Sequence, residues 1–121
     1  MGQRKWVVEF YRKANGRCPT EEFLDSLANE EKVFIRRSIQ RLEEYGNQLQ
    51  RPHAAPLLDH IMELRKRTHQ GNVRLLYFFF DGEKFIVTHG FKKKSDKVPA
   101  SEIDKAIEFR KDYFERIKRK S

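Results

Sequence analysis

Basic side chains stand near the ends of three strand-like runs of this sequence. Arg65 lies near the far end of LLDHIMELRKRT (57–68), Arg74 near the start of NVRLLYFFF (72–80), and Lys92–Lys94 directly after KFIVTHGF (84–91). Because successive antiparallel strands return to the same end of a sheet, we expect these cations to converge. Arginine holds phosphate oxygens through paired N–H donors, and lysine adds a mobile point charge. The pattern therefore predicts a phosphate-binding cluster that could stabilise a pentavalent phosphorane.

A second interpretation of the same cations has similar weight on residue pattern alone. Strand ends carry lysine and arginine very often, and such charges stay solvated and protect sheet edges from aggregation. Under either interpretation we expect Lys94 and Lys97 to be largely exposed.

Aromatic residues near these cations could contribute to binding. The run from Tyr77 to Phe80 is expected to be mostly core, because a continuous apolar run suits a central strand buried on both faces. Alternation along a strand, however, puts Tyr77 and Phe78 on opposite faces, so one of the two rings could line an open sheet face. A ring in that position can stack on a nucleobase, as in proteins that bind single strands. Phe91, beside the lysines, is predicted to be partly packed and partly exposed.

The sequence offers little for other kinds of chemistry. Its histidines (His53, His60, His69 and His89) have no ligand-like spacing, and Cys18 is the single cysteine, so no metal site is predicted. Neither GxxxxGK[ST] nor GxGxxG occurs, and we expect no cofactor. Cys18 itself is expected to be a small buried hydrophobic residue.

Turn signals and periodicity predict the elements that position the cations. A strand over 6–11 is followed by a short helix from Pro19 and by a longer helix that Asn29 is predicted to cap and Gly46 to end. Residues 47–56 are predicted to be a connecting loop. Three strands follow, with Asp81-Gly82 as a hairpin turn, and a helical stripe runs from about residue 103 to the end.

These elements predict one α+β domain over residues 1–121. Three consecutive strands form an antiparallel β-meander, to which an N-terminal strand is added. The two early helices and the C-terminal helix are predicted to pack on one face of the sheet. The other face would stay partly open, and we expect the functional site on that face.

Charge favours anionic partners. Lys and Arg number 26 against 18 Asp and Glu, which gives a net charge of +8. Nucleic acid, an acidic protein or a membrane surface would each be attracted to such a chain. Because no apolar run approaches the ~20 residues that span a bilayer, no membrane partner is predicted, and a cytoplasmic location is expected.

Four segments carry a resemblance to a known family. They are PTEEFLDSL (19–27), MELR (62–65), GNVRLLYFF (71–79) and THGFKKKSDKVPASEIDKA (88–106). Taken in this order, with the strand at 6–11, they resemble the RelE/ParE superfamily of type II toxins, in its phage-derived, HigB-like branch. The resemblance spans most of the chain and implies a RelE-like fold.

The resemblance also implies an activity and partners. Toxins of this kind cleave mRNA in the A site of the translating ribosome without a metal or cofactor. The ribose 2′-OH attacks the adjacent phosphate and leaves a 2′,3′-cyclic phosphate and a 5′-OH. A cognate antitoxin protein neutralises the toxin in a hetero-oligomer.

The matching positions receive the following roles from the resemblance. Arg65 and Arg74 would bind the scissile phosphate, while Lys92 and Lys93 would neutralise the transition state or transfer a proton. Phe91 would stack on or orient a base. Three further residues are assigned to substrate binding: Lys94, and His89 and Tyr77 as approximate counterparts of the catalytic His/Tyr sets of some relatives.

Two other functions stay open at this point. A ParE-like toxin would block DNA gyrase through a protein–protein contact, and its lysine run would be incidental. A non-catalytic basic module would bind RNA or DNA with strong salt dependence but would not cleave it. Fold-level resemblance does not separate these functions.

Overall fold

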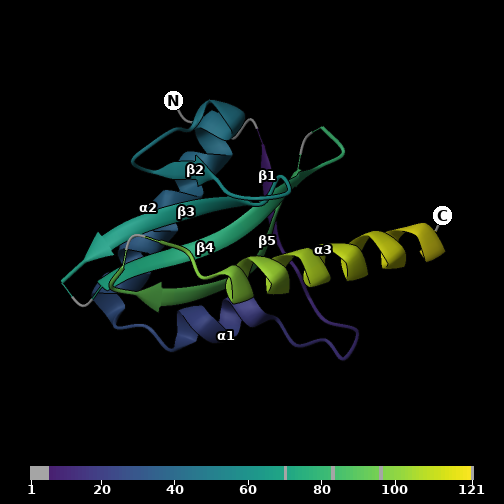
Figure 1. The fold of residues 1–121 in the computed structure, drawn as a ribbon, viewed down its shortest axis with the longest axis horizontal. Coiled ribbons are helices and arrows are strands. Elements are labelled where there is room, and N and C mark those ends of the chain that lie inside the picture. Colours follow the sequence, from purple (N-terminus) through teal and green to yellow (C-terminus); the bar gives the residue numbers. More distant parts are fainter. Residues whose placement is uncertain (1–5, 70, 83, 96, 121) are drawn as a thin grey trace.

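A computed structural model describes residues 6–69, 71–82, 84–95 and 97–120 of the chain (Figure 1). Within these residues lie three α-helices, one short 3-10 helix and five β-strands. The helices are α1 (Pro19–Asp25), α2 (Asn29–Tyr45) and α3 (Ala100–Lys120), and the 3-10 helix is η1 (Gly46–Gln48). The strands are β1 (Val7–Phe10), β2 (Ala54–Pro56), β3 (Met62–Thr68), β4 (Gly71–Phe80) and β5 (Lys84–Lys93).

The strands form one mixed sheet in the order β1-β5-β4-β3-β2. The predicted meander is present as β3, β4 and β5, which pair antiparallel. The sheet is larger than the prediction, because β1 pairs in parallel with β5 and the short edge strand β2 pairs with β3. The expectation that residues 47–56 form only a loop was therefore wrong.

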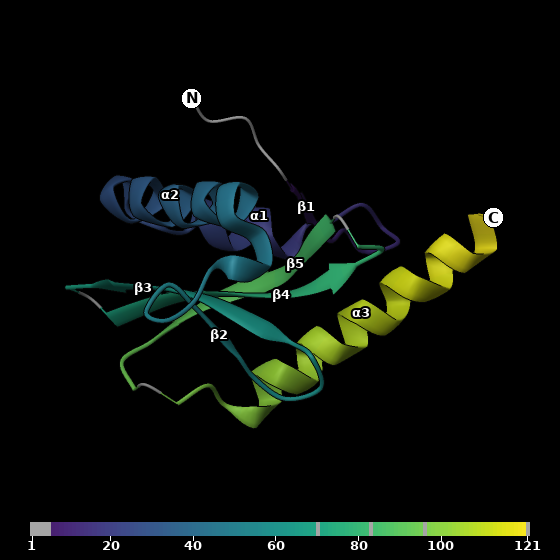
Figure 2. The same ribbon diagram turned by 90° about the horizontal axis from the view of Figure 1, so that it is seen from above.

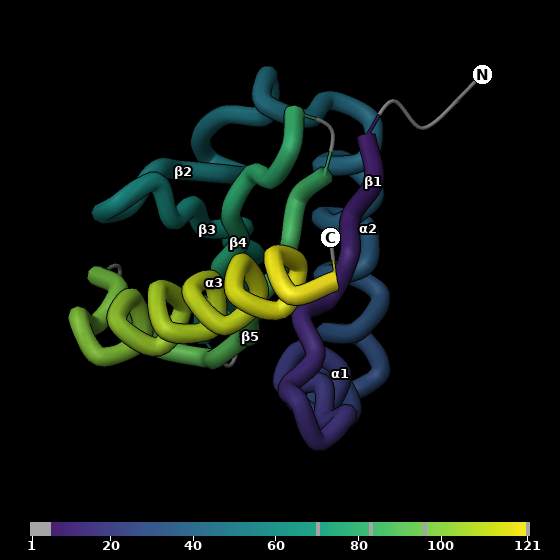
Figure 3. The backbone as a smooth tube through the Cα atoms, turned by 90° about the vertical axis from the view of Figure 1, so that its right-hand side faces the viewer, coloured from purple at the N-terminus to yellow at the C-terminus, as the bar shows by residue number. Residues whose placement is uncertain are grey.

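Helices cover both faces of this sheet, which corrects the predicted one-sided packing. Figures 2 and 3 show α1 and α2 on one side and α3 on the other. Each side has its own buried cluster, with Leu64, Leu75 and Tyr77 beneath α1 and α2. Leu76 and Phe78 lie beneath α3. The apolar run of β4 supplies side chains to both faces, so both need a cover.

Turn chemistry decides where the strands begin and end. Asp81 and Gly82 have φ values of 58° and 74°, as a tight hairpin between β4 and β5 requires, and this prediction is confirmed. The predicted strand from Leu57 begins only at Met62. Asp59 and His60 adopt the left-handed region with φ values of 54° and 62°, which interrupts the extended chain.

The predicted helix boundaries hold for α1 and α2 with one shift. Pro19 occupies the first turn of α1, as expected. The residue that caps α2 is Ala28 and not Asn29, and its backbone N–H donates to the Glu31 carboxylate at 3.2 Å. Gly46 ends α2 with a positive φ, and a Cβ atom there would meet the Trp6 ring at 2.4 Å.

Candidate functional site

Strand register brings the predicted cations to one end of β3, β4 and β5. Arg65 pairs with Arg74, and Arg74 pairs on its other side with Phe91. In the same way, Asn72 stands between Arg67 and Lys93. Both rows lie on the face that carries α3, because side chains two apart along a strand share a face. The predicted convergence is therefore confirmed for Arg65, Arg74 and Lys93. We call these three residues, together with Arg67, the cationic end.

Members of the cationic end differ in exposure. Arg67 and Lys93 are exposed and Arg65 is half-buried, whereas Arg74 has no accessible surface. An exposed cation can reach a phosphate in solvent, and a fully covered one cannot. Arg65, Arg67 and Lys93 thus form the accessible part of the cluster.

Arg74 is held from two sides beneath the surface. Its Nη2 donates to the Ser95 carbonyl, just beyond the end of β5. Its Nη1 lies 3.8 Å from the carboxylate of Glu63, which is also buried. Among the described residues, Nε and Nη1 have no hydrogen-bond acceptor. Arg74 therefore fastens the segment after β5 to the sheet and leaves a buried positive charge beside Arg65.

Two guanidinium groups opposite each other on neighbouring strands are unfavourable for folding. Like charges at directly paired positions repel each other. Glu63 offsets part of this repulsion from the next row, where it pairs with Leu76. An anion bound beside Arg65 would reduce this repulsion further.

Lys92 lies on the opposite face from the cationic end. It pairs with Val73, whose side chain belongs to the core beneath α1 and α2. Its ammonium group donates to both carboxylate oxygens of Glu31 on α2, at 2.8 and 3.1 Å. The prediction grouped Lys92 with Lys93 at one phosphate, but the structure places the side chains of these two lysines on opposite faces of the sheet.

Glu31 is the carboxylate at the centre of this second cluster. It is 6% exposed, and besides Lys92 it accepts hydrogen bonds from the Ala28 backbone N–H at 3.2 Å and the Thr68 hydroxyl at 3.4 Å. Hydrogen bonds from Lys92 hold the pKa of Glu31 below its ordinary value of 4.5, although burial acts in the opposite direction. The pair ties the end of β5 to the start of α2.

His89 links β5 to α3. Its Nε2 lies 3.0 Å from the Glu102 carboxylate and its Nδ1 lies 3.0 Å from the Thr88 hydroxyl. The ring is 4% exposed, and burial lowers its pKa below 6.5, although Glu102 acts in the opposite direction. Both ring nitrogens are thus engaged inside the protein.

The remaining predicted site residues divide between core and surface. Tyr77 is 2% exposed in the core beneath α1 and α2, and burial raises the pKa of its phenol well above the usual value. Phe91 is 8% exposed and packs beneath α3, so it is more buried than the mixed role we expected. Lys94 and Lys97 are exposed, as predicted.

Sequence reasoning missed Arg67 and Glu31. Arg67 follows Arg65 by two positions on a strand, so period-two alternation was a sufficient signal for it. Glu31 contacts a lysine 61 positions away in the chain, and no local pattern reports such a contact.

The described residues also set limits on other kinds of site. No group of three or more His, Cys, Asp or Glu in this part of the chain is arranged to hold a metal ion. Among the described helices, none combines the length and apolar character that crossing a bilayer requires. The arrangement that the chain does have is a cluster of accessible cations beside a buried one.

Comparison with known proteins gives one family match. A family model described as phage derived protein Gp49-like (DUF891) matches residues 22–111. These residues run from α1 into α3 and contain the whole cationic end together with Glu31 and Lys92. No curated protein matches the chain.

Proposed function

The chain belongs to the Gp49-like family of phage-derived proteins, and from that premise we propose that it is the toxin of a toxin–antitoxin pair that cleaves mRNA on the ribosome. The family is associated with toxins of such pairs. In finer terms, we assign the chain to the HigB-like branch of the RelE toxins.

The observation that carries the proposal is the cationic end. Arg65 and Arg74 are directly paired across two strands, and Arg67 and Lys93 flank Asn72 in the next row. A phosphodiester at this position would meet one half-buried guanidinium and two exposed cations. Arginine and lysine together suit a phosphate whose charge grows on its non-bridging oxygens during reaction.

The proposed reaction is an internal transfer of the phosphoryl group. The ribose 2′ oxygen forms a bond to phosphorus as its proton leaves, and the bond from phosphorus to the 5′ oxygen breaks. The 5′ oxygen takes up a proton, so the products are a 2′,3′-cyclic phosphate and a 5′-OH. Because the RNA supplies the nucleophile, the protein contributes charge stabilisation and orientation.

Different residues have different roles in this scheme. Arg65, Arg67 and Lys93 contact the phosphate and stabilise its charge. Arg74 is a positioning residue, since its buried guanidinium holds the Ser95 carbonyl and adds positive potential behind Arg65. His89 and Lys92 are also positioning residues, because Glu102 and Glu31 engage them.

We also propose an antitoxin as the partner protein, in a hetero-oligomer. A net charge of +8 favours an acidic or amphipathic segment of that partner. The second ligand in this proposal is mRNA in the ribosomal A site.

Purified components test the function. Wild-type protein and the Arg65→Gln variant are incubated with an end-labelled mRNA, either free or on initiated ribosomes. We expect cuts within the reading frame on ribosomes, with 2′,3′-cyclic phosphate ends, and at least a hundredfold loss of rate in Arg65→Gln. Intact mRNA together with inhibited gyrase supercoiling would instead establish a gyrase inhibitor. Salt-dependent RNA binding without any cleavage would establish a binding module.

A further inference from the structure

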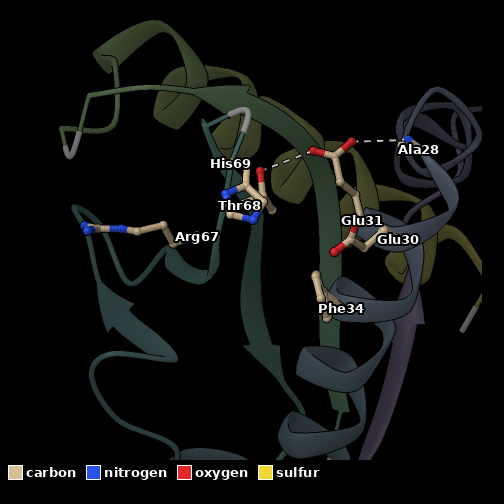
Figure 4. A pocket seen from close by; sticks show the side chains of 7 residues that line it. All are labelled: Ala28, Glu30, Glu31, Phe34, Arg67, Thr68 and His69. Atoms are coloured by element: carbon tan, nitrogen blue, oxygen red, sulfur yellow. Dashed lines mark hydrogen bonds between the residues drawn. The ribbon is translucent and has the colours of Figure 1, made fainter.

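A cleft of about 420 Å³ lies between the start of α2 and the end of β3. Figure 4 shows Thr68 and His69 on the strand side and Glu30, Glu31 and Phe34 on the helix side, while Arg67 extends away from the gap. The cleft is on the opposite side of the sheet from Arg65, at the same end of β3. Because Arg67 belongs to both the cationic end and the lining of this cleft, the two sites adjoin.

Phe34 gives this cleft an aromatic wall. Its ring is half-buried on α2, and the Lys66 ammonium group lies 5.1 Å from the ring centroid. Lys66 pairs with Val73, which puts it on the same face as Lys92. This ammonium group lies over the ring face, so a stacked base would take its place there, and the displaced lysine would attract the adjoining phosphate.

Two carboxylates stand beside this wall, and they differ in availability. Both oxygens of Glu31 accept hydrogen bonds from within the protein, from Lys92, Ala28 and Thr68. Glu30 is exposed at the mouth of the cleft. A carboxylate accepts hydrogen bonds from an exocyclic amine, such as N4 of cytosine, and uracil has no such amine.

We propose that this cleft binds the base of a nucleotide next to the scissile phosphate and prefers bases that carry an exocyclic amine. The inference rests on the proposed function and deepens it, because it assigns a base-selecting subsite to an RNA-cleaving toxin. Phe34 stacks on the base, Glu30 accepts from its amine, and Arg67 bridges to the phosphate at the cationic end. Glu31 holds the cleft in shape through Lys92 and Thr68.

Binding of short uncleavable RNA tests this inference without relying on catalysis. The probes are labelled pentamers UUXUU with 2′-fluoro sugars, in which X is uracil, cytosine, adenine or guanine. Without a 2′-OH these pentamers are resistant to the proposed reaction, and their affinity is measured by fluorescence anisotropy at low ionic strength. We expect wild-type protein to bind at least one amine-bearing pentamer about tenfold more tightly than the all-uracil pentamer.

Variants separate the two contacts. Glu30→Ala should bring the ratio between amine-bearing and all-uracil pentamers close to one, and this ratio is insensitive to the lost charge because all the probes carry the same charge. Glu44→Ala, at an exposed glutamate near the other end of α2, should keep the wild-type ratio. Phe34→Leu should weaken binding of every pentamer about tenfold, whereas Phe114→Leu, at a 43% exposed ring on α3, should not. Unchanged urea midpoints show that each variant is folded.

The possible outcomes distinguish this inference from the function on which it rests. Equal affinity for all pentamers, or an unchanged ratio in Glu30→Ala, would overturn the base subsite. The cleft would then be assigned to binding a side chain of the antitoxin. Ribosome-dependent cleavage by wild-type protein could still occur in that case, and the proposed function would stand. If the wild-type protein neither binds the pentamers nor cleaves mRNA on ribosomes, the base subsite and the proposed function are both overturned.

Discussion

Separating Lys92 from Glu31 should destabilise the protein by an amount that the geometry of the pair predicts. One ammonium group donates to both carboxylate oxygens at 2.8 and 3.1 Å, with side-chain exposures of 29% for Lys92 and 7% for Glu31. Loss of one partner from a fully buried pair costs about 3–5 kcal/mol, while exposed pairs contribute about 0–1 kcal/mol. This pair lies between those limits, because Lys92 reaches solvent and Glu31 does not.

We therefore expect different losses from the two single variants. Glu31→Gln should cost about 2 kcal/mol of unfolding free energy, since the Lys92 ammonium can turn to water. Lys92→Met should cost about 3 kcal/mol, because among the described residues it leaves the buried Glu31 carboxylate with only the Ala28 and Thr68 donors. The double variant should lose less than the two together, with a coupling energy of about 1.5 kcal/mol.

Urea unfolding followed by the fluorescence of Trp6, the single tryptophan, measures these free energies. Trp6 packs against the core beneath α1 and α2, so its emission reports unfolding of that core. The matched control is the ion pair of Arg12 and Glu21, which has a similar distance of 2.9 Å but side-chain exposures of 53% and 50%. The control cycle should show no measurable coupling.

The same pair predicts a pH dependence. The folded pKa of Glu31 is lowered, so the stability it contributes is present above 4.5 and is lost as pH falls through the folded pKa. Glu31→Gln should lack this part of the acid slope. A coupling energy below about 0.5 kcal/mol, or the same acid slope in Glu31→Gln, would refute the stabilising role of the Lys92–Glu31 pair. Lys92 would then again be a candidate for phosphate contact.

Three further predictions follow from the cationic end and from His89. Arg65→Gln and Lys93→Met should each reduce the slope of log K against log salt for single-stranded RNA by about 0.7; an unchanged slope would exclude that residue from phosphate contact. Arg74→Ala should cost about 3 kcal/mol in the urea assay, because it removes a guanidinium from beside the buried Glu63 carboxylate and opens a cavity; a loss below about 1 kcal/mol would contradict a buried fastening role. Because the folded pKa of His89 is lowered, its contribution to stability is present above pH 6.5 and falls as pH drops below that value. His89→Gln should therefore flatten the pH profile of unfolding free energy below pH 6.5. An unaltered profile would contradict the assigned burial effect.

The position of the site could be predicted because strand topology fixes it. Once three runs are known to be consecutive antiparallel strands, the end of one must lie beside the start of the next. Arg65 and Arg74 prove to be direct partners for that reason. The same reasoning extends to Lys93, which shares Asn72 as its neighbour with Arg67.

The face of each cation was harder to predict. The strand was expected to end at Phe91, so alternation was not carried on to Lys92 and Lys93, whereas β5 continues to Lys93. Had the alternation been extended, it would have put Lys92 opposite to Phe91 and Lys93. Burial of Arg74 depends on the segment after β5 folding back so that the Ser95 carbonyl accepts a hydrogen bond from the guanidinium, and no pattern within β4 encodes that contact.

The two-sided cover of the sheet was missed for a similar reason. The apolar run of β4 correctly indicated a strand buried on both faces, yet all the helices were assigned to one face. Phe78 needs a cover of its own, and α3 supplies it through Tyr113 and Phe114, whose rings meet Phe78 edge-on at 5.8 and 5.6 Å. Side-chain pattern identifies buried faces, but the path of the connecting segment decides which helix covers each face.

Mapping of RNA 5′-OH ends in cells after brief induction tests the central claim most directly. Wild-type protein is compared with Arg65→Gln and with Arg37→Gln, which removes an exposed arginine from α2, on the opposite face of the sheet from the cationic end. We predict new 5′-OH ends inside translated frames for wild type and Arg37→Gln, and their loss in Arg65→Gln. Growth arrest with intact mRNA, or undiminished cutting by a folded Arg65→Gln protein, would contradict the account.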